Sequence, residues 1–215
     1  MEHEQQLREF MISSAGEIGL RVDELHAEQF MRYLTHLIEW NNVINLTSII
    51  DPKEIIIKHF VDSLTALMAT SFPQNSVVLD VGTGGGFPGI PIKIVRSDIR
   101  LILIDPVQKK CSFLNSVIGL LQLRDVSTFH GTIKQYAGQP LHQLIDTIVV
   151  RALKFEGIRK DVLSLLTSKG KIVLYRTSLI KNHEIVKEFQ VASEISLALP
   201  YGSGNRVITV LEKIY

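Results

Sequence analysis

The chain has 215 residues, enough for one α/β domain with an appendage, and a hydrophobic content of 46% supports a sizeable core. The formal net charge of +1 does not by itself indicate a nucleic-acid binder, and the single cysteine excludes an internal disulfide. The sequence holds no Cys/His cluster with zinc spacing, no apolar run of membrane-spanning length and no signal-peptide start. We therefore expect a cytoplasmic protein with no metal and no membrane partner.

Charge is unevenly distributed along the chain. Residues 1–75 carry 5 Lys and Arg against 11 Asp and Glu, whereas residues 76–215 carry 18 against 11. A basic second part indicates a polyanionic partner, and an ordinary solvated surface explains the counts equally well. We divide the chain at the same place, into an N-terminal helical extension over residues 1–75 and an α/β domain over residues 76–215 on which it packs.

Helical spacing of apolar residues dominates the N-terminal extension. It predicts two helices, residues 2–18 and 23–40. Asp23 is the candidate N-cap of the second helix, and residues 41–47 interrupt its pattern. Asp51-Pro52 is typical of a cap followed by proline at the first helical position, so a third helix follows. That helix places His59 and Asp62 on one face, as a structural pair or as a pair turned toward a substrate.

From residue 77 onward, short apolar strands alternate with helical patterns. This alternation predicts a doubly wound, mostly parallel α/β sheet of the Rossmann-like type. The expected strands are residues 77–81, 101–104, 126–129, 145–150, 171–175 and 206–211. Helices are expected after residue 89, over residues 109–121, around 162–166 and around 180–189, with segment 195–199 following the last. We expect the final strand, reached through the turn 201–205, to pair antiparallel.

The stretch from Val77 to Gly89 joins a buried strand to a helix through glycines, a unit that presents backbone N–H groups to a ligand. Gly84-x-Gly86-x-x-Gly89 fits the dinucleotide fingerprint, and hence an NAD-dependent oxidoreductase. Asp80-x-Gly82-x-Gly84-x-Gly86 resembles the first motif of class I S-adenosylmethionine-dependent methyltransferases. We prefer the second frame, because Gly82 already holds the strand-end position that a pyrophosphate-binding turn gives to its first glycine. A tight turn without a ligand is the third interpretation.

Three further strand ends carry polar or charged residues, and the carboxyl ends of parallel strands are where open α/β sheets bind ligands. Asp105 follows Gly82 by 23 residues, a spacing that favours a carboxylate bound to ribose hydroxyls, with a helix cap as the alternative. Ile133-Lys134 lies in the turn after the third strand. Arg151 closes the fourth strand, where a charge needs a partner, either a ligand or a structural ion pair.

The motifs, taken in order, resemble the bacterial small-subunit ribosomal RNA methyltransferase G family, formerly glucose-inhibited division protein B. The matching pieces span nearly the whole chain: Trp40-Asn41, Asn45-Leu46-Thr47, His59-Phe60-Val61-Asp62-Ser63-Leu64, the stretch from Asp80 to Pro91, Asp105 with Lys109-Lys110 and Phe113-Leu114, and Arg151-Ala152. Two places depart from the pattern. Many relatives have Gly-Arg-Ala-Glu where this chain has Gly131-Thr132-Ile133-Lys134, and Gly-Glu-Arg where it has Gly204-Asn205-Arg206.

The resemblance implies methyl transfer from S-adenosylmethionine to N7 of one guanine in 16S ribosomal RNA of the small ribosomal subunit, guanosine 527 in the family. With the glycine turn and Asp105 included, the expected cofactor contacts are Gly82, Gly84, Gly86, Phe87, Asp105, Ile133, Lys134 and Arg151. Arg151 is also the candidate catalytic residue. Guanine N7 carries a free in-plane lone pair, so its attack needs positioning and no general base.

Two alternatives stay open at the level of sequence. One is the oxidoreductase indicated by the dinucleotide frame, and the other is a non-enzymatic RNA-binding protein of ribosome assembly. The sequence does not define the oligomeric state, and a monomer is the default expectation.

Overall fold

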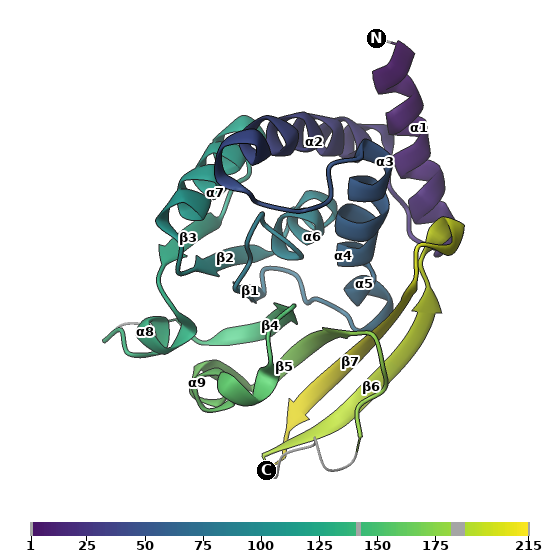
Figure 1. The fold of residues 1–215 in the computed structure, drawn as a ribbon. Coiled ribbons are helices and arrows are strands. Elements are labelled where there is room, and N and C mark those ends of the chain that lie inside the picture. The colour runs from purple at the N-terminus through teal and green to yellow at the C-terminus, as the bar shows by residue number, and fades with distance from the viewer. Residues whose placement is uncertain (1, 141–142, 182–187, 215) are drawn as a thin grey trace.

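A seven-stranded sheet forms the centre of the molecule (Figure 1). The computed structural model describes residues 2–140, 143–181 and 188–214. The strands are β1 (Val77–Val81), β2 (Arg100–Asp105), β3 (Val126–His130), β4 (Ile145–Arg151), β5 (Leu166–Arg176), β6 (Phe189–Ala198) and β7 (Asn205–Lys213). They lie in the order β3-β2-β1-β4-β5-β7-β6; β1 to β5 are parallel and β7 is antiparallel to both neighbours. The predicted doubly wound sheet with an antiparallel last strand is therefore confirmed.

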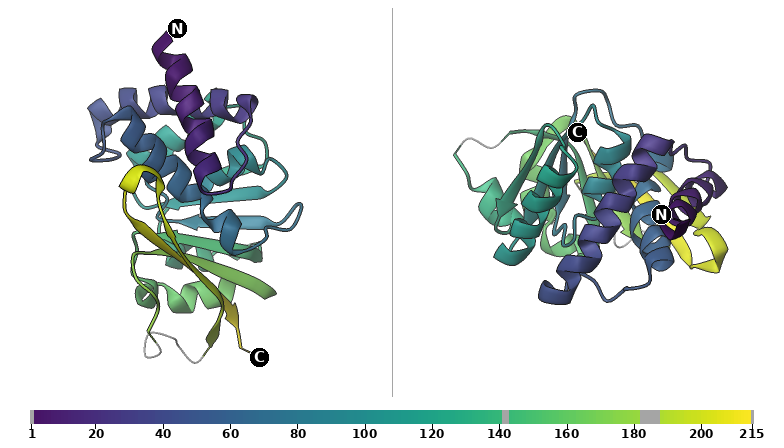
Figure 2. Two further views of the ribbon diagram at one scale, coloured as in Figure 1. Left: turned by 90° about the vertical axis from the view of Figure 1, so that its right-hand side faces the viewer. Right: turned by 90° about the horizontal axis from the view of Figure 1, so that it is seen from above.

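Helices cover both faces of this sheet. The larger core cluster joins one face to α1 (Glu2–Glu17), α2 (Glu24–Ile44), α3 (Pro52–Ile55), the π-helical turn η1 (Ile56–Val61), α4 (Asp62–Leu64), α5 (Ala66–Ala69), α6 (Gly89–Val95) and α7 (Gln108–Leu120). The other face packs against α8 (Ile133–Ala137) and α9 (Arg159–Leu165). Among the described residues, the chain also forms the short 3-10 turns η2 (Phe155–Gly157) and η4 (Pro200–Gly202). Figure 2 shows the N-terminal helices gathered over one side of the molecule. Phe10 of α1 stacks on Tyr201 of η4, with ring centroids 5.1 Å apart.

The strand order reverses between β1 and β4. All five residues of β1 are buried, as expected for a parallel strand covered on both faces. From β1 the chain moves outward to β2 and β3, and it then returns to place β4 on the other side of β1. Ligands of open α/β sheets bind at such a reversal, beyond the carboxyl ends of the strands. The glycine turn after β1 and Arg151 at the end of β4 both lie there.

The two N-terminal helices form as predicted, with one difference in length. Asp23 caps α2, because its side chain accepts the N–H of His26 at 2.9 Å. The sequence predicts that α2 ends at Trp40, and this is wrong, since the helix continues to Ile44. It ends only where Asn45 adopts a left-handed conformation (φ 50°), which asparagine tolerates better than most residues.

The predicted helix around residues 180–189 is wrong in the part that the structure describes. Residues 179–181 are not helical and Phe189 begins β6, while residues 182–187 lie outside the described residues. β6 also begins six residues before the expected segment 195–199. It pairs with β7 at nine positions, and such cross-strand contacts outweigh a local helical pattern.

Two absences concern the described residues only. None of their helices is long and apolar enough to cross a membrane. Within the same residues, no group of three or more His, Cys, Asp or Glu side chains is arranged to hold a metal ion.

Candidate active site

The turn after β1 is built on glycines with positive φ, a region that residues with a side chain rarely adopt. The φ angles are 68° at Gly82, 59° at Gly84 and 96° at Gly86. A Cβ atom on Gly86 would lie 2.5 Å from Tyr33 Oη, and one on Gly82 would lie 2.6 Å from Leu153. At Gly84 nothing lies within 4 Å of such an atom. Gly84 therefore presents main chain to open space, as close approach of a ligand requires.

Asp80, inside β1, carries a buried acceptor beside this turn. Its Oδ2 accepts the hydroxyl of Thr83 at 2.6 Å and the N–H of Gly89 at 2.8 Å. Its Oδ1 has no hydrogen-bond partner among the described residues, although it is buried. Burial raises the pKa of Asp80 to about 7, and the bonds from Thr83 and Gly89 oppose that shift. A buried oxygen without a donor fits a ligand that brings an N–H or O–H group.

Asp105, at the end of β2, braces the glycine turn. Its Oδ2 accepts the N–H of Gly84 at 2.9 Å, and its Oδ1 accepts the N–H of Val107 at 2.9 Å. The second bond is made to Val107, the N-cap residue of α7, and no side chain caps that helix, so the helix-cap alternative for Asp105 is wrong. Each carboxylate oxygen has a further lone pair, so contact with ribose hydroxyls stays a prediction.

The turn after β3 lies next to Asp105. The N–H of Gly131 donates to the main-chain oxygen of Asp105 at 3.0 Å. Thr132 then caps α8 in a reciprocal arrangement with Gln135. Ile133 is buried and the side chain of Lys134 is exposed. This short helix starts at the ligand edge of the sheet, and the cofactor contacts of Ile133 and Lys134 stay predictions.

Arg151, at the end of β4, lies in a dense polar cluster. Its Nη2 donates to the main-chain oxygen of Lys58 at 2.9 Å and lies 2.9 Å from Nδ1 of His59. Its Nη1 lies 3.3 Å from Oδ2 of Asp62, a carboxylate that is fully buried. Arg206 of β7 donates two hydrogen bonds to the same carboxylate, from Nε at 2.5 Å and from Nη2 at 2.8 Å. The ion pair that was the alternative interpretation of Arg151 is thus present.

His59 links this cluster to the glycine turn. It lies in η1, a π-helical segment of the kind that often occurs at functional sites. Burial, and next the charge of Arg151, lower the pKa of His59 to about 3, so the ring is neutral near pH 7. Arginine has no acceptor, so Nδ1 of His59 accepts from Arg151 and Nε2 donates to Thr47 Oγ1 at 2.7 Å.

Phe87 closes the turn against the N-terminal helices. Its ring stacks on His59 at 4.5 Å and on Tyr33 at 5.7 Å, and Arg151 lies 5.9 Å above it. The hydroxyl of Tyr33 donates to the main-chain oxygen of Gly85. Helix α2 therefore fixes the glycine turn from one side while Asp105 fixes it from the other.

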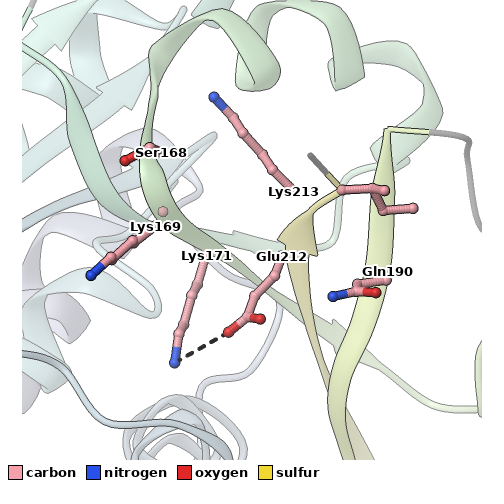
Figure 3. A pocket seen from close by; sticks show the side chains of 8 residues that line it. Ser168, Lys169, Lys171, Gln190, Glu212 and Lys213 are labelled. Atoms are coloured by element: carbon pink, nitrogen blue, oxygen red, sulfur yellow. Dashed lines mark ion pairs between the residues drawn. The ribbon is translucent and has the colours of Figure 1, made fainter.

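The surface hollows do not all lie at this edge. Figure 3 shows a hollow of about 590 Å³, where Lys171 forms an ion pair with Glu212 at 3.6 Å. It lies at the start of the long β5 strand, the end opposite the carboxyl edge, so we do not assign the cofactor to it. Two smaller hollows, of about 480 and 400 Å³, lie at the carboxyl ends of β4 and β5.

The predicted site residues form two neighbouring groups. Gly84, Asp105 and the turn before Ile133 are joined by hydrogen bonds, and Phe87 and Arg151 meet around His59. The sequence does not reveal that Oδ1 of Asp80 is buried without a hydrogen-bond partner, and it assigns no role to Tyr33 or Arg206. The one sequence feature that includes Arg206 is Gly204-Asn205-Arg206, which stands where many relatives have Gly-Glu-Arg.

Solved structures with similar folds define the class of this protein. The precorrin-6y C5,15-methyltransferase of Geobacter metallireducens has a TM-score of 0.51 and 18% identity, covering 71% of this chain and 86% of its own. TrmN of Thermus thermophilus has a TM-score of 0.56 and 17% identity, covering 72% of this chain and 48% of its own. At this identity the likeness concerns the fold alone, and the fold is that of the class I methyltransferases.

The family follows from closer relatives. The family model described as rRNA small subunit methyltransferase G matches residues 26–209. The ribosomal RNA small subunit methyltransferase G of Desulforamulus reducens is 36% identical over 212 residues, 94% of this chain and 88% of the relative. That of Clostridium botulinum is 36% identical over 183 residues, 85% of this chain and 75% of the relative. The chain belongs to the rRNA small subunit methyltransferase G family, which confirms the resemblance seen in the sequence.

Proposed function

We propose that this chain transfers the methyl group of S-adenosylmethionine to N7 of one guanine in 16S ribosomal RNA, guanosine 527 by its resemblance to the family. Family membership supports an enzyme that methylates small-subunit ribosomal RNA and uses S-adenosylmethionine. The observation that carries the proposal for this site is the glycine turn, where the main chain of Gly84 faces open space beside the unpartnered Oδ1 of Asp80. The family model and the relatives support neither the oxidoreductase nor the non-enzymatic assembly protein.

The cofactor fits the groups at this edge. The unpartnered Oδ1 of Asp80 suits a donor such as the methionine ammonium, and the free lone pairs of Asp105 suit ribose hydroxyls. Main-chain N–H groups at Ile133 and Lys134 are the proposed contacts for the adenine end, because a main-chain contact does not depend on the glutamate that many relatives have there. When bound, S-adenosylmethionine supplies a methyl group on a positively charged sulfonium.

The chain itself then has to orient the reactants. Guanine N7 attacks with its own lone pair, so no residue has to remove a proton first, and the site holds none in a base–nucleophile arrangement. Neutral His59 cannot repel a cationic sulfonium, and its ring fixes both Phe87 and Arg151. Arg151 is the proposed catalytic residue, because its flat guanidinium can stack on or hydrogen-bond to the target base at the carboxyl end of β4.

Further parts of the proposal concern organisation and location. We place the cofactor domain at residues 76–215 and the helical extension at residues 1–75. The partner is 16S ribosomal RNA within the small ribosomal subunit, the working location is the cytoplasm, and the working state is a monomer.

The test is methyl transfer to small ribosomal subunits purified from cells that lack this gene. Tritiated S-adenosylmethionine gives the amount transferred, and chemical cleavage at N7-methylguanosine gives its position. We expect one methyl group per subunit at guanosine 527. Binding of NAD in place of S-adenosylmethionine in a thermal-shift measurement, or no transfer to subunits at any stage of assembly, contradicts the proposal.

A further inference from the structure

A hollow lined by three arginines lies beside the cluster around Asp62. It has a volume of about 480 Å³ and is formed where β4 and β5 end and β7 begins; its polar lining is Arg151, Tyr175, Arg176, Thr177, Ser178 and Arg206. Apart from Arg151, which lines the hollow itself, the groups proposed for the cofactor belong to β1, β2 and the turns after β1 and β3. The hollow lies beyond β1 in the opposite direction along the strand order, on the side of β4, β5 and β7.

Charge is not balanced beneath this hollow. The guanidiniums of Arg151 and Arg206 share the single carboxylate of Asp62, at 3.3 Å and 2.5 Å. Asp62 is fully buried and each arginine side chain is only 16% exposed, so water screens these charges poorly. Asp62 is the only carboxylate within ion-pair distance of either arginine among the described residues. Among Asp62, Arg151 and Arg206 one positive charge is left over, and an anion bound in the hollow would balance it.

The donors of Arg206 point to the shape of that anion. A guanidinium has five N–H groups. Three of them bind Asp62 through Nε and Nη2 and the main-chain oxygen of Arg176 through Nη1, at 2.5, 2.8 and 3.2 Å. The two others, one on Nη1 and one on Nη2, find no acceptor in the parts of the chain that the structure describes. They are available to an oxyanion, the kind of ligand that guanidiniums bind through paired N–H groups.

We propose that Arg206, with Arg151 beside it, seats a phosphate of the RNA strand that carries the target guanine. The inference rests on the proposed function for the identity of the RNA, and it adds the subsite that holds the backbone. Asp62 acts as a positioning residue, since it fixes both guanidiniums before RNA arrives. Ser178 lies on the exposed rim and can add a hydroxyl donor. The methionine carboxylate of the cofactor is the other oxyanion at hand, and the experiment separates the two.

Two variants of the whole chain test this phosphate-binding site, which we call the seat. Arg206→Gln removes the two free donors, and its fold is checked by its melting temperature, because it also leaves Asp62 with one partner fewer. Ser178→Asp places a negative charge on the rim without touching Asp62, and Ser178→Asn is its neutral control. Arg100→Gln controls for the loss of an exposed arginine at the start of β2, the far end of the sheet.

Three experiments are done on each variant: calorimetry gives the affinity for S-adenosylmethionine, filter binding gives the affinity for small ribosomal subunits over a range of salt, and steady-state kinetics give the KM and kcat of methyl transfer. We expect Arg206→Gln and Ser178→Asp to raise KM and the subunit Kd by about tenfold or more. For Arg206→Gln, the log–log salt slope should fall by about one phosphate contact. Cofactor affinity should stay within about twofold, and both controls should behave like the wild type.

The other outcomes separate failure of the phosphate-binding proposal from failure of the proposed function. A parallel loss of cofactor affinity in both variants assigns the oxyanion to the methionine carboxylate. Unchanged subunit binding by folded Ser178→Asp and an unchanged salt slope for Arg206→Gln leave only a structural ion pair. Wild-type protein that binds subunits without methylating them contradicts the proposed function, while the binding comparison still decides the seat. Wild-type protein that does not bind subunits contradicts both.

Discussion

Gly84 donates its main-chain N–H to Oδ2 of Asp105 at 2.9 Å, a bond that ties the turn after β1 to the end of β2. The same carboxylate accepts the N–H of Val107, just before α7, so one side chain shapes both the turn and the neighbouring strand end. Asp105, which is predicted to bind the ribose, thus also stabilises the main chain around it. The two roles are separable, because the structural bonds use only one lone pair on each oxygen.

We expect Asp105→Ala to weaken S-adenosylmethionine binding by about 1–3 kcal/mol, the range for hydrogen bonds to a charged group. Asp105→Asn is the matched control, because its amide oxygen can still accept one of the two main-chain bonds. The alanine variant should keep its far-ultraviolet circular dichroism spectrum. If titration calorimetry finds that Asp105→Ala binds S-adenosylmethionine as tightly as the wild type, Asp105 is not a cofactor ligand and only holds the glycine turn.

Gly84 and Gly86 should respond differently to a side chain. Gly84→Val puts a branched side chain into open space, so the fold bears only the strain of a positive φ, about 1–2 kcal/mol, while the ligand is blocked. Gly86→Val collides with Tyr33 Oη as well as Ile90, so it should lower the melting temperature more. Thermal unfolding with and without S-adenosylmethionine compares the two. A Gly84→Val protein that the cofactor still stabilises fully shows that the turn is structural only.

Asp80 should make cofactor binding depend on pH. Its pKa of about 7 means that the carboxylate is largely protonated at pH 6 and charged at pH 8. The unpartnered oxygen accepts best when charged, so we expect affinity for S-adenosylmethionine to rise with pH across this window. Asp80→Asn should bind about tenfold more weakly at pH 8 and lose this dependence, a factor equal to one pKa unit of interaction. Titration calorimetry at pH 6, 7 and 8 gives the comparison, and equal pH dependence in the two proteins argues against Asp80 as a ligand.

The same pKa predicts the stability of the free protein. Folding raises the pKa of Asp80 from 3.8 to about 7, so its contribution is fully present below pH 3.8 and is lost as pH rises to 7. His59 acts in the opposite sense, because its pKa falls from 6.5 to about 3 and its contribution is lost as pH falls. Comparing wild type with Asp80→Asn at each pH cancels the His59 contribution. In urea unfolding, the variant should gain stability over wild type between pH 5 and pH 8, and a constant difference contradicts the raised pKa.

Local signals in the sequence predict most of the ligand edge. The glycines of the turn, Asp105 and Arg151 follow apolar strands directly, and a strand that is buried on both faces is easy to recognise. The ion pair of Asp62 and Arg206 is different, because 144 residues separate its members and only the pairing of β7 with β5 brings Arg206 to the carboxyl edge. No pattern reports such a pair before the strand order is known.

Tertiary contacts also explain the remaining errors. Tyr33 reads as one more apolar position of α2, yet its hydroxyl holds the main chain of Gly85 across 52 residues. The helix predicted around residues 180–189 runs up to Phe189, which pairs with Lys213 of β7 and begins a strand instead. In both cases the deciding neighbour lies far away in sequence, where periodicity carries no information.

Arg151→Lys tests the catalytic assignment. Lysine keeps the positive charge near Asp62, so the variant should fold, but an ammonium cannot span the main-chain oxygen of Lys58, Nδ1 of His59 and Asp62 from one planar group. We expect most methyl transfer to be lost, by about 100-fold or more, equivalent to about 2.7 kcal/mol in the transition state. If Arg151 holds the base, affinity for S-adenosylmethionine stays constant while kcat falls. If it holds the cofactor, the affinity falls in parallel. Near-normal transfer to small ribosomal subunits by Arg151→Lys excludes both roles and leaves a general positive charge at the end of β4.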